Sequence, residues 1–519
     1  MKKRILSLFM VFSMVFMLIT SVSALTKNDQ QTLTVNKVEK GTVINVYQII
    51  KLNVNDSGNI LSPTFQWTDE VARWFSTANG SSFASYNENG NVTDKFSDLS
   101  GDAAKPFWEA LAKDIKILGI TPIQKTATGT SVDVRLNMGE YLILANGGTS
   151  KAYMPQAHAV LPRKVGTDYQ LDATATVNLK SKDITIEKEV TDNDDKTVGI
   201  GDTVEYSLHT DVPEYPENAS HIFYQVVDNM STGLTYDKNV KVYTDEGRNN
   251  EVSSSEYEKE ETNRGFKLKF NSEYIKGLSG KSLYLTYSAT VNENAVVGRD
   301  PLKNTATLEF SNDPYNESDH KTLTVDENVY TYNICFQKES ISGNTLTGAK
   351  FELLDEQMNK INLVKIDNDG NYRLAKAGET VSNIIESSTE NFKIDGLDTG
   401  IYYLVEKEAP NGYVLPVNNQ IKITLVDNGP NEPDGTPNEP DGTLDENTSV
   451  EGMNIDINNN SIQINSVSLS FTVVNKTAGD LNLPITGDSG IYIYLITGAG
   501  TMIIAILLLI TNKKKNDVK

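Results

Sequence analysis

Short alternating segments dominate the chain from Ile184 to Asn475, and this pattern constrains its fold more than any other feature. ITIEKEV, TVEYSLHT, LYLTYSATV, AKFELLD and QIKITLVD place apolar residues at every second position, with Gly, Asn or Asp turns between segments. A period of two predicts half-buried strands, and a long series of such strands predicts β-sandwiches. We therefore expect an all-β chain of tandem, Ig-like β-sandwiches.

Residues 25–180 differ because helix-spaced apolar groups interrupt the strand pattern at residues 67–75 and 102–117. Asp102 is a residue type that favours helix N-termini, so we expect the second helix to begin there. Strand patterns return at YLILANGG and at residues 173–179. This part is predicted to be one α+β or sandwich-like domain with helical insertions.

The start of the chain carries an export signal. Lys2, Lys3 and Arg4 precede an apolar run over residues 5–20, and small residues follow up to Ala24. This order is typical of a secretory signal peptide cut after Ala24.

The end of the chain carries a second signal, LPITG, formed by Leu483, Pro484, Ile485, Thr486 and Gly487. An apolar stretch and a lysine-rich tail follow it, and about 20 helical residues span a bilayer core. We expect a C-terminal transmembrane helix here. The arrangement resembles the cell-wall sorting signal of Gram-positive surface proteins, which implies that a sortase cuts between Thr486 and Gly487.

These patterns divide the chain into five parts. We expect a signal peptide, a first domain, a middle sandwich, a last sandwich and a sorting tail, at residues 1–24, 25–180, 181–330, 331–480 and 481–519. PNEPDGT occurs twice in tandem from residue 430, and this density of Pro and Gly predicts a surface loop. The formal charge of −22 disfavours nucleic acid as a partner. Cys335 is the only cysteine, so no disulfide can form within the chain.

Strand alternation places polar residues on apolar faces in both sandwiches. Lys188 and Asn304 do so in the opening and closing strands of the middle sandwich, and Lys338 and Asn475 do so in the last one. An unpaired buried ammonium is costly and tends to lose its proton. A neutral amine beside a carboxamide can attack the carbonyl carbon and expel ammonia, provided that an acid assists.

Each sandwich offers such an acid. Glu406 shares a face with Tyr402 and Leu404, and Asp228 shares a face with Tyr224 and Val226. A buried carboxylic acid with a raised pKa can polarise the carbonyl group and shuttle protons.

The motifs around these acids carry a family resemblance. YLVEKEAPNGY resembles the E-box of collagen-adhesin B-type domains in sortase-assembled pilins, and GDTVEYSLHTDVP, VVDNMSTGLTY and LKNTATLEFSN resemble the middle domain of pilin backbone subunits. The resemblance implies isopeptide bonds from Lys338 to Asn475 with Glu406, and from Lys188 to Asn304 with Asp228.

Two alternatives stay open in this assignment. Asn312 has the same strand parity as Asn304 and is a second candidate partner in the middle sandwich. In the first domain, Lys37 shares a face with apolar residues and Glu140 lies in GEYLILA, but Asn178 falls on the polar face. A first-domain cross-link is therefore less well supported.

The resemblance also implies an acceptor lysine at the end of the first domain, where shaft pilins carry a VYPK-like motif. VNLKSKD occupies this place, so Lys180 corresponds to the motif lysine, with Asn-Leu in place of Tyr-Pro. Lys182 is the alternative acceptor. Lys180 shares the polar face of Thr174, Thr176 and Asn178, where an enzyme can reach it.

We therefore expect a non-enzymatic structural protein, the major shaft subunit of a surface pilus anchored to the cell wall. The expected partners are pilus-type and housekeeping sortases, other copies of the chain, minor pilins and peptidoglycan. The alternative is a wall-anchored adhesin, or a minor tip or base pilin, that binds host matrix. No ligand spacing or cofactor motif occurs, so no metal or cofactor is expected.

Overall fold

The computed structural model describes residues 25–480, except residues 100, 149, 192–195, 296, 298–300, 388–390, 430–438, 453–454, 456–461 and 466. The expected signal peptide, the LPITG motif, the apolar stretch and the basic tail all lie outside the described residues, as does most of the tandem heptapeptide. Strands make up 50% of the structure and helices 10%, which confirms the predicted all-β class. No helix in the described part is long and apolar enough to cross a membrane.

The chain divides into two compact units. One contains Met1–Lys196, Gly201–Val296 and Pro301–Val329, and the other contains Thr197–Ile200, Val297–Asp300 and Tyr330–Lys519. The predicted boundary at residue 330 falls where the second unit resumes. The predicted boundary at residue 180 lies inside the first unit, and it stays a prediction.

The first 180 residues form a three-stranded sheet of order β13-β1-β7 and a larger sheet of order β10-β8-β2-β3-β5-β4, in which β6 also pairs with β2. Leu33, Val35 and Val134 of the smaller sheet pack against Ile44 and Ile143 of the larger one. The strands up to residue 183 are β1 (Gln30–Asn36), β2 (Val43–Val54), β3 (Ile60–Trp67), β4 (Asn87–Glu88), β5 (Asn91–Val92), β6 (Ile123–Thr126), β7 (Ser131–Asn137), β8 (Gly139–Asn146), β9 (Lys151–Tyr153), β10 (Gln156–Val160), β11 (Arg163–Val165), β12 (Asp168–Gln170), β13 (Thr174–Asn178) and β14 (Ser181–Asp183).

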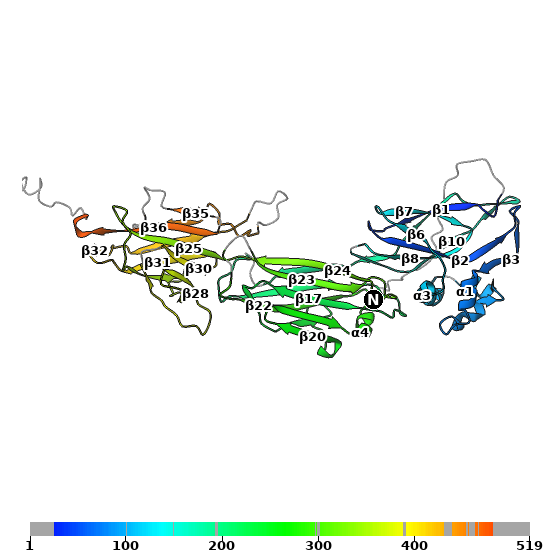
Figure 1. The fold of residues 1–519 in the computed structure, drawn as a ribbon, viewed down its shortest axis with the longest axis horizontal. Helices are drawn as coiled ribbons and strands as arrows, with labels where there is room; N and C mark the ends of the chain where they lie inside the picture. The colour runs from blue at the N-terminus through cyan, green and yellow to red at the C-terminus, as the bar shows by residue number, and fades with distance from the viewer. Residues whose placement is uncertain are drawn as a thin grey trace, which may run out of the picture. The chain divides into compact units, whose positions relative to one another are not determined.

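Helices cover the other face of the larger sheet, as Figure 1 shows for α1 and α3. Trp74 and Phe107 of these helices are buried against Ile49 and Leu142. The helical elements are α1 (Asp69–Trp74), η1 (Ser81–Tyr86), α2 (Asp94–Ser97), η2 (Gly101–Ala103), α3 (Lys105–Asp114) and η3 (Ile115–Ile117). Asp102 was predicted to start the second helix, and this is wrong. A separate 3₁₀ turn occupies residues 101–103, and α3 begins at Lys105 after Ala104.

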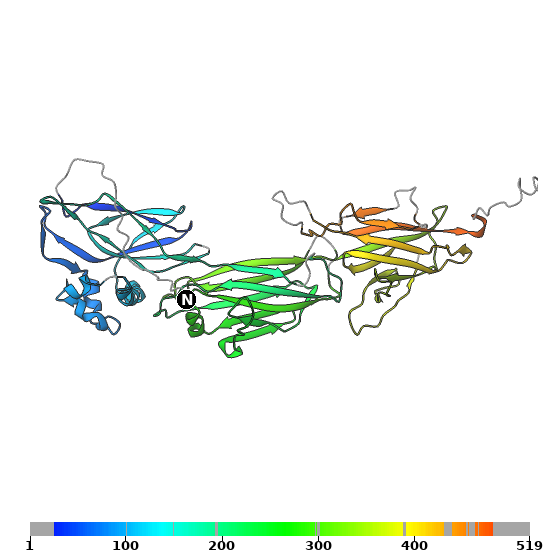
Figure 2. The same ribbon diagram turned by 180° about the vertical axis from the view of Figure 1, so that it is seen from behind.

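The middle region is a sandwich of two five-stranded sheets, seen from behind in Figure 2. One sheet has the order β15-β16-β22-β18, with β19 also on β22, and the other has the order β20-β21-β17-β23-β24. Its elements are β15 (Ile186–Val190), β16 (Thr203–Asp211), β17 (Tyr224–Met230), β18 (Leu234–Tyr236), β19 (Lys241–Tyr243), η4 (Ser254–Glu256), β20 (Tyr257–Thr262), β21 (Gly265–Phe270), α4 (Ser272–Gly277), β22 (Ser282–Val291), β23 (Leu302–Ser311) and β24 (His320–Val329).

The last region is also a two-sheet sandwich. Its larger sheet has the order β27-β28-β30-β25-β36-β32, with β35 also on β36, and its smaller sheet has the order β29-β26-β31-β33-β34. The elements are β25 (Tyr332–Ser340), β26 (Lys350–Leu354), β27 (Leu363–Lys365), β28 (Asn371–Leu374), β29 (Ile385–Glu386), β30 (Phe392–Leu397), β31 (Gly400–Glu408), β32 (Tyr413–Val414), β33 (Gln420–Leu425), β34 (Ser449–Glu451), β35 (Gln463–Asn465), β36 (Ser468–Thr477) and η5 (Ala478–Asp480).

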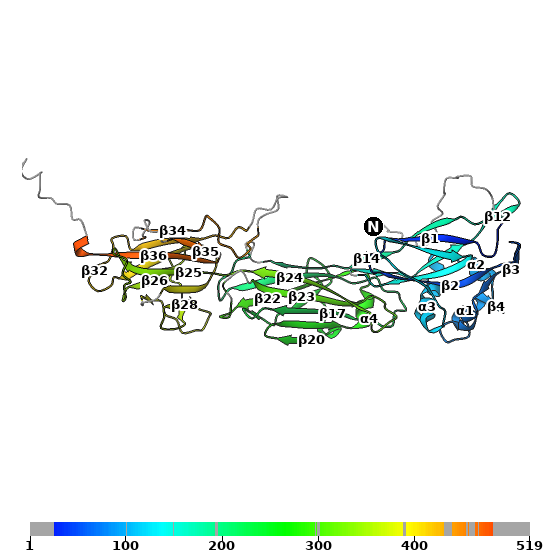
Figure 3. The ribbon, with the colours of Figure 1, turned by 45° about the horizontal axis from the view of Figure 1, so that its top comes forward.

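The first and last long strands of this sandwich, β25 and β36, are parallel neighbours and lie side by side in Figure 3. Phe336 and Phe471 face each other in their register, with ring centroids 5.6 Å apart. This stacked pair lies in the apolar core that the alternating residues of both sheets fill. Because side chains alternate across a strand, Lys338 and Asn475, two and four residues further on, point into the same core.

Candidate functional site: buried lysine, asparagine and acid clusters

The last sandwich buries the predicted lysine, asparagine and glutamate together. Lys338, Glu406 and Asn475 are each 1% exposed, so water does not solvate these groups. Lys338 Nζ lies 2.6 Å from Asn475 Oδ1 and donates a second hydrogen bond to the Val473 carbonyl. Asn475 Nδ2 donates to Glu406 Oε1 at 2.8 Å. The carboxamide therefore lies between the amine and the acid.

The two sheets supply different members of this cluster. Lys338 and Asn475 come from the neighbouring strands β25 and β36, whereas Glu406 comes from β31 in the facing sheet. Burial raises the pKa of Glu406, against the lowering effects of the Lys338 charge and the Asn475 hydrogen bond. Burial also lowers the pKa of Lys338 to about 8, against the raising effect of Glu406. Both shifts favour the uncharged forms, a neutral amine and a neutral acid.

The middle sandwich buries a corresponding cluster. Lys188 Nζ lies 2.7 Å from Asp228 Oδ2, and both side chains are 0% exposed. Asn304 is also fully buried, and its side chain lowers the pKa of the Asp228 carboxyl group. Lys188 lies on β15 of one sheet, whereas Asp228 and Asn304 lie on β17 and β23 of the other. A bond from Lys188 to Asn304 would therefore join the two sheets.

A tyrosine that the sequence analysis did not identify completes this cluster. The Tyr287 hydroxyl donates to Asp228 Oδ2 at 2.5 Å and accepts from Asn304 Nδ2 at 3.5 Å. Lys188 Nζ also lies over the rings of Tyr206 and Tyr287, 5.2 and 5.7 Å from their centroids. The signal was present in LYLTYSATV, where Tyr287 has the inward parity of Leu283 and Leu285.

Burial shifts the protonation of this cluster in the same way. It raises the pKa of Asp228, although Lys188, Tyr287 and Asn304 act in the opposite direction. It lowers the pKa of Lys188, although Asp228 raises it. Asp228 Oδ1 and Asn304 Oδ1 have no hydrogen-bond partner among the described residues. A buried acceptor without a partner is costly, so this arrangement fits a neutral acid that can donate a proton.

The other candidate cross-link residues do not assemble. Asn312 lies beyond the end of β23, eight residues after Asn304, which is roughly 26 Å along a strand. Its side chain contacts the backbone of Gly147. In the first domain, Lys37 is exposed with φ 62°, because β1 ends at Asn36 and the next residue turns away from the core.

Glu140 and Asn178 do not complete a first-domain cluster either. Asn178 is exposed, as its parity predicts. Burial raises the pKa of Glu140 to about 7, but no lysine or asparagine contact of this carboxyl group occurs among the described residues.

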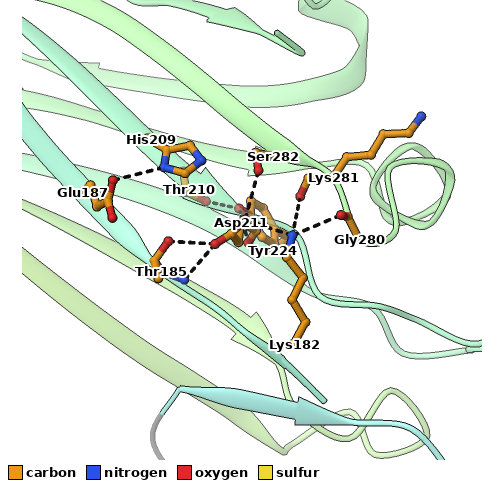
Figure 4. Close-up of polar contacts among 10 residues, drawn as sticks. All are labelled: Lys182, Thr185, Glu187, His209, Thr210, Asp211, Tyr224, Gly280, Lys281 and Ser282. Atoms are coloured by element: carbon orange, nitrogen blue, oxygen red, sulfur yellow. Dashed lines mark hydrogen bonds and ion pairs between the residues drawn. The ribbon is translucent and has the colours of Figure 1, made fainter. Parts of the chain in front are cut away.

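The two candidate acceptor lysines differ in their surroundings. Lys180 is exposed, and its side chain makes no ion pair or hydrogen bond to any described residue. Lys182 Nζ forms an ion pair with Asp211 at 2.9 Å and donates to the carbonyl of Gly280, as Figure 4 shows. Exposure therefore favours Lys180 as the lysine that another protein can reach.

Comparisons with known families match three segments of the chain. Residues 200–314 match the Gram-positive pilin backbone subunit 2, Cna-B-like domain, and residues 332–436 match a prealbumin-like fold domain. Residues 482–517 match the LPXTG cell wall anchor motif, which confirms the predicted sorting signal. Cleavage between Thr486 and Gly487 stays a prediction.

A curated relative and two solved structures are similar to this chain. The chain is 26% identical over 434 residues to the trypsin-resistant surface T6 protein of Streptococcus pyogenes serotype M6, covering 76% of this chain and 72% of the relative. The T6 backbone pilin structure, described as a modular three-domain structure, aligns with a TM-score of 0.58 at 20% identity, over 88% of this chain and all of that one. The full-length major pilin SpaD of Corynebacterium diphtheriae aligns at 18% identity and a TM-score of 0.47, over 77% of this chain and 92% of that one. The predicted resemblance to Gram-positive backbone pilins is confirmed.

Proposed function

We propose that this chain, which carries Gram-positive backbone pilin domains and a cell wall anchor motif, is the major shaft subunit of a sortase-assembled surface pilus. The backbone pilin domains and the anchor motif occur in one chain, and the anchor motif follows both domains. In this proposal the LPITG motif links each subunit, through Thr486, to a lysine of the next subunit. Lys180 is the proposed acceptor.

One observation supports the proposal that the subunit cross-links itself. The Asn475 side chain contacts the Lys338 amine through its oxygen and the Glu406 carboxyl group through its nitrogen. The Lys338 amine attacks Asn475 Cγ, and Glu406 donates a hydrogen bond to the carboxamide as the tetrahedral carbon forms. The C–N bond to the carboxamide nitrogen then breaks, and that nitrogen leaves as ammonia with the proton that the amine loses. One amide forms and one ammonia departs, so no oxidant or cofactor takes part.

The middle cluster supports the same reaction between Lys188 and Asn304. Asp228 takes the place of Glu406, and Tyr287 links the acid to the carboxamide. Each reaction occurs once in the life of the chain, so the chain is a structural protein that modifies itself. Covalent links between distant residues restrict the unfolded chain and stabilise the fold, by several kcal/mol for loops of about 100 residues.

Intact mass spectrometry of residues 25–482 tests the self-cross-linking. Each bond removes one ammonia, about 17 Da, so two bonds predict a deficit of about 34 Da. The full calculated mass would contradict both bonds. A double variant, Glu406→Ala with Asp228→Ala, is expected to show the full mass and serves as the reference.

Polymerisation tests the shaft role separately. Cells that make the full chain and a pilus-type sortase should give a ladder of covalent polymers in a denaturing gel. A wall-anchored adhesin or minor pilin would instead run as a single wall-linked species. Absence of a ladder from correctly exported protein would contradict the shaft role.

A further inference from the structure

Two lysines compete for the same reaction in the segment that follows β13. Lys180 and Lys182 have the same strand parity, so alternation alone would present both on one face. The structure separates them because the pairing changes between them. β13 pairs with β1 up to Asn178, whereas β14 pairs with β9 from Ser181.

Asp211 at the end of β16 holds the Lys182 amine. The Lys182 side chain is 28% exposed and that of Asp211 is 12% exposed. Lys182 Nζ lies 2.9 Å from Asp211 Oδ1 and 3.1 Å from the carbonyl of Gly280 (Figure 4). The amine is therefore directed at one acid and at the backbone that precedes β22.

Asp211 is itself held in place by its neighbours. Its Oδ2 accepts hydrogen bonds from the backbone nitrogen of Thr185 at 3.2 Å and from the Thr185 hydroxyl at 2.7 Å. Its Oδ1 accepts from the Ser282 hydroxyl at 2.9 Å. Burial raises the pKa of Asp211, but the side-chain hydrogen bonds from Lys182, Thr185 and Ser282 outweigh it, so the pKa lies below its usual value. The carboxylate thus stays charged and oriented toward Lys182 at neutral pH.

Lys180 has a fixed backbone and a free side chain. The Met154 nitrogen donates to the Lys180 carbonyl at 3.1 Å, and the Leu179 nitrogen donates to the Asn36 carbonyl at 3.1 Å. Leu179 is 2% exposed and anchors the segment in the core. The Lys180 amine therefore extends into solvent from an ordered main chain.

We propose that Asp211 is a specificity-determining residue, which directs the intersubunit bond to Lys180 by keeping Lys182 in an ion pair. This inference rests on the proposed function, because it concerns the choice of acceptor in that reaction. Asp211 does not touch the reacting atoms of Lys180.

The chemistry explains why an ion pair excludes a lysine. Any lysine must lose a proton to expose the lone pair that attacks the Thr486 carbonyl carbon, and an ammonium held against a carboxylate must also break that ion pair first. In the net reaction the Thr486–Gly487 amide breaks, a new amide forms between Thr486 and the lysine, and the proton lost by the amine is balanced by the new amino terminus at Gly487. Lys182 would have to leave both Asp211 and the Gly280 carbonyl to take part.

The inference is tested in cells that make the full chain with a pilus-type sortase, by asking whether a second substitution at Asp211 restores polymer formation to a variant that lacks Lys180. Lys180→Ala alone should abolish the ladder. Lys180→Ala with Asp211→Asn should restore part of it, and peptide mapping should locate the new bond at Lys182. Asn removes the charge and keeps one acceptor oxygen, which can face either Thr185 or Ser282. Asp211→Ser in the same background is the second variant, and its thermal midpoint shows whether the fold is retained.

The control and the contrary outcomes are distinct. Lys180→Ala with Glu260→Gln removes an ion pair with Lys267 on the outer hairpin, and it should not restore the ladder. A folded Lys180→Ala, Asp211→Asn protein without a ladder overturns the role of Asp211 and leaves the shaft function standing. A ladder from Lys180→Ala alone, bonded through Lys182, overturns the selection by Asp211 as well as the assignment of Lys180. No ladder from the unmodified chain contradicts the shaft function itself.

Discussion

Asn475 and Lys338 lie on neighbouring parallel strands, and the carboxamide oxygen of Asn475 is 2.6 Å from the amine of Lys338. Glu406 contacts the other end of the same carboxamide from the facing sheet. A lysine, an amide and an acid in this order, removed from water, are the components that amide exchange requires.

The first prediction concerns Glu406. Glu406→Gln keeps the size of the side chain but cannot act as an acid, so the bond in the last sandwich should fail. The mass deficit of residues 25–482 should fall from about 34 Da to about 17 Da. Glu408→Gln on the same strand is the control, because Glu408 pairs with Lys350 at the surface and should leave the full deficit. An undiminished deficit in Glu406→Gln would show that the acid is dispensable.

The second prediction concerns Tyr287. Tyr287→Phe keeps the ring but removes the hydroxyl that joins Asp228 to Asn304. We expect a mixed population in which only part of the chains carry the middle bond, visible as two masses about 17 Da apart. Tyr284→Phe, on the same strand and stacked on His209, should leave one mass. A single, fully linked mass in Tyr287→Phe would exclude a role for the hydroxyl.

The third prediction is a pH dependence that only an unlinked last sandwich should show. In Asn475→Ala, Lys338 stays an amine with a folded pKa of about 8, against 10.5 as the ordinary value. Between these pH values the unfolded state binds more protons than the folded state, so stability should rise with pH by about 3 kcal/mol. The raised pKa of Glu406 affects stability in a different pH range. Above about pH 4.5 the folded state keeps the proton that the unfolded state loses, so stability falls as pH rises.

Calorimetry checks this dependence. The relevant unfolding transition is that of the last sandwich, which is recognised because its midpoint temperature differs between Asn475→Ala and the native chain. The native chain should show no rise between pH 8 and 10.5, because an amide does not titrate. Asn475→Ala with Lys338→Met should also be flat in that range. A flat profile for Asn475→Ala itself would mean that Lys338 is not desolvated.

The fourth prediction concerns the loop that carries the tandem repeat. Asp427 is 5% exposed, and its carboxylate accepts from the backbone nitrogens of Gly429, Gly442 and Thr443 and from the Tyr332 hydroxyl. Asp427→Asn replaces one acceptor oxygen with a donor, so it should destabilise the loop ends by about 1–3 kcal/mol. Amide hydrogen exchange at Gly442 and Thr443 should become about 5- to 150-fold faster.

Glu446→Gln provides the matched control for the loop, since Glu446 is exposed and lies three residues after Thr443. In Glu446→Gln, the amides of Gly442 and Thr443 should exchange at the same rate as in the native chain. Unchanged exchange in Asp427→Asn would show that the loop is held elsewhere.

Strand parity was sufficient to find most of the two clusters. Lys338, Glu406 and Asn475 each fall in long alternating strands, where one register fixes every side chain. Tyr287 was not found, because its role depends on which strand faces β22 across the sandwich, and a single strand does not carry that information. Strand alternation therefore predicts which side chains point into the core, but it does not predict which of them meet across the sandwich.

Parity failed where a strand ends. Lys37 has the parity of Leu33 and Val35, but β1 stops at Asn36 and the left-handed backbone of Lys37 turns its side chain outward. Lys180 and Lys182 share a parity, yet the chain changes strand partners between them and only Lys182 meets Asp211. Such breaks depend on tertiary pairing, which alternation does not reveal.

The pairing of Lys338 with Asn475 has a consequence for cleavage of the backbone in the last sandwich. The two residues are 137 positions apart, so the proposed bond closes the intervening chain into a ring. A single nick anywhere inside that ring, the repeat-bearing loop included, leaves both fragments joined through the side chains. With that bond in place, the covalent path from β25 to the end of β36 would run through the side chains of Lys338 and Asn475, so a change in the length of the intervening chain would not interrupt it.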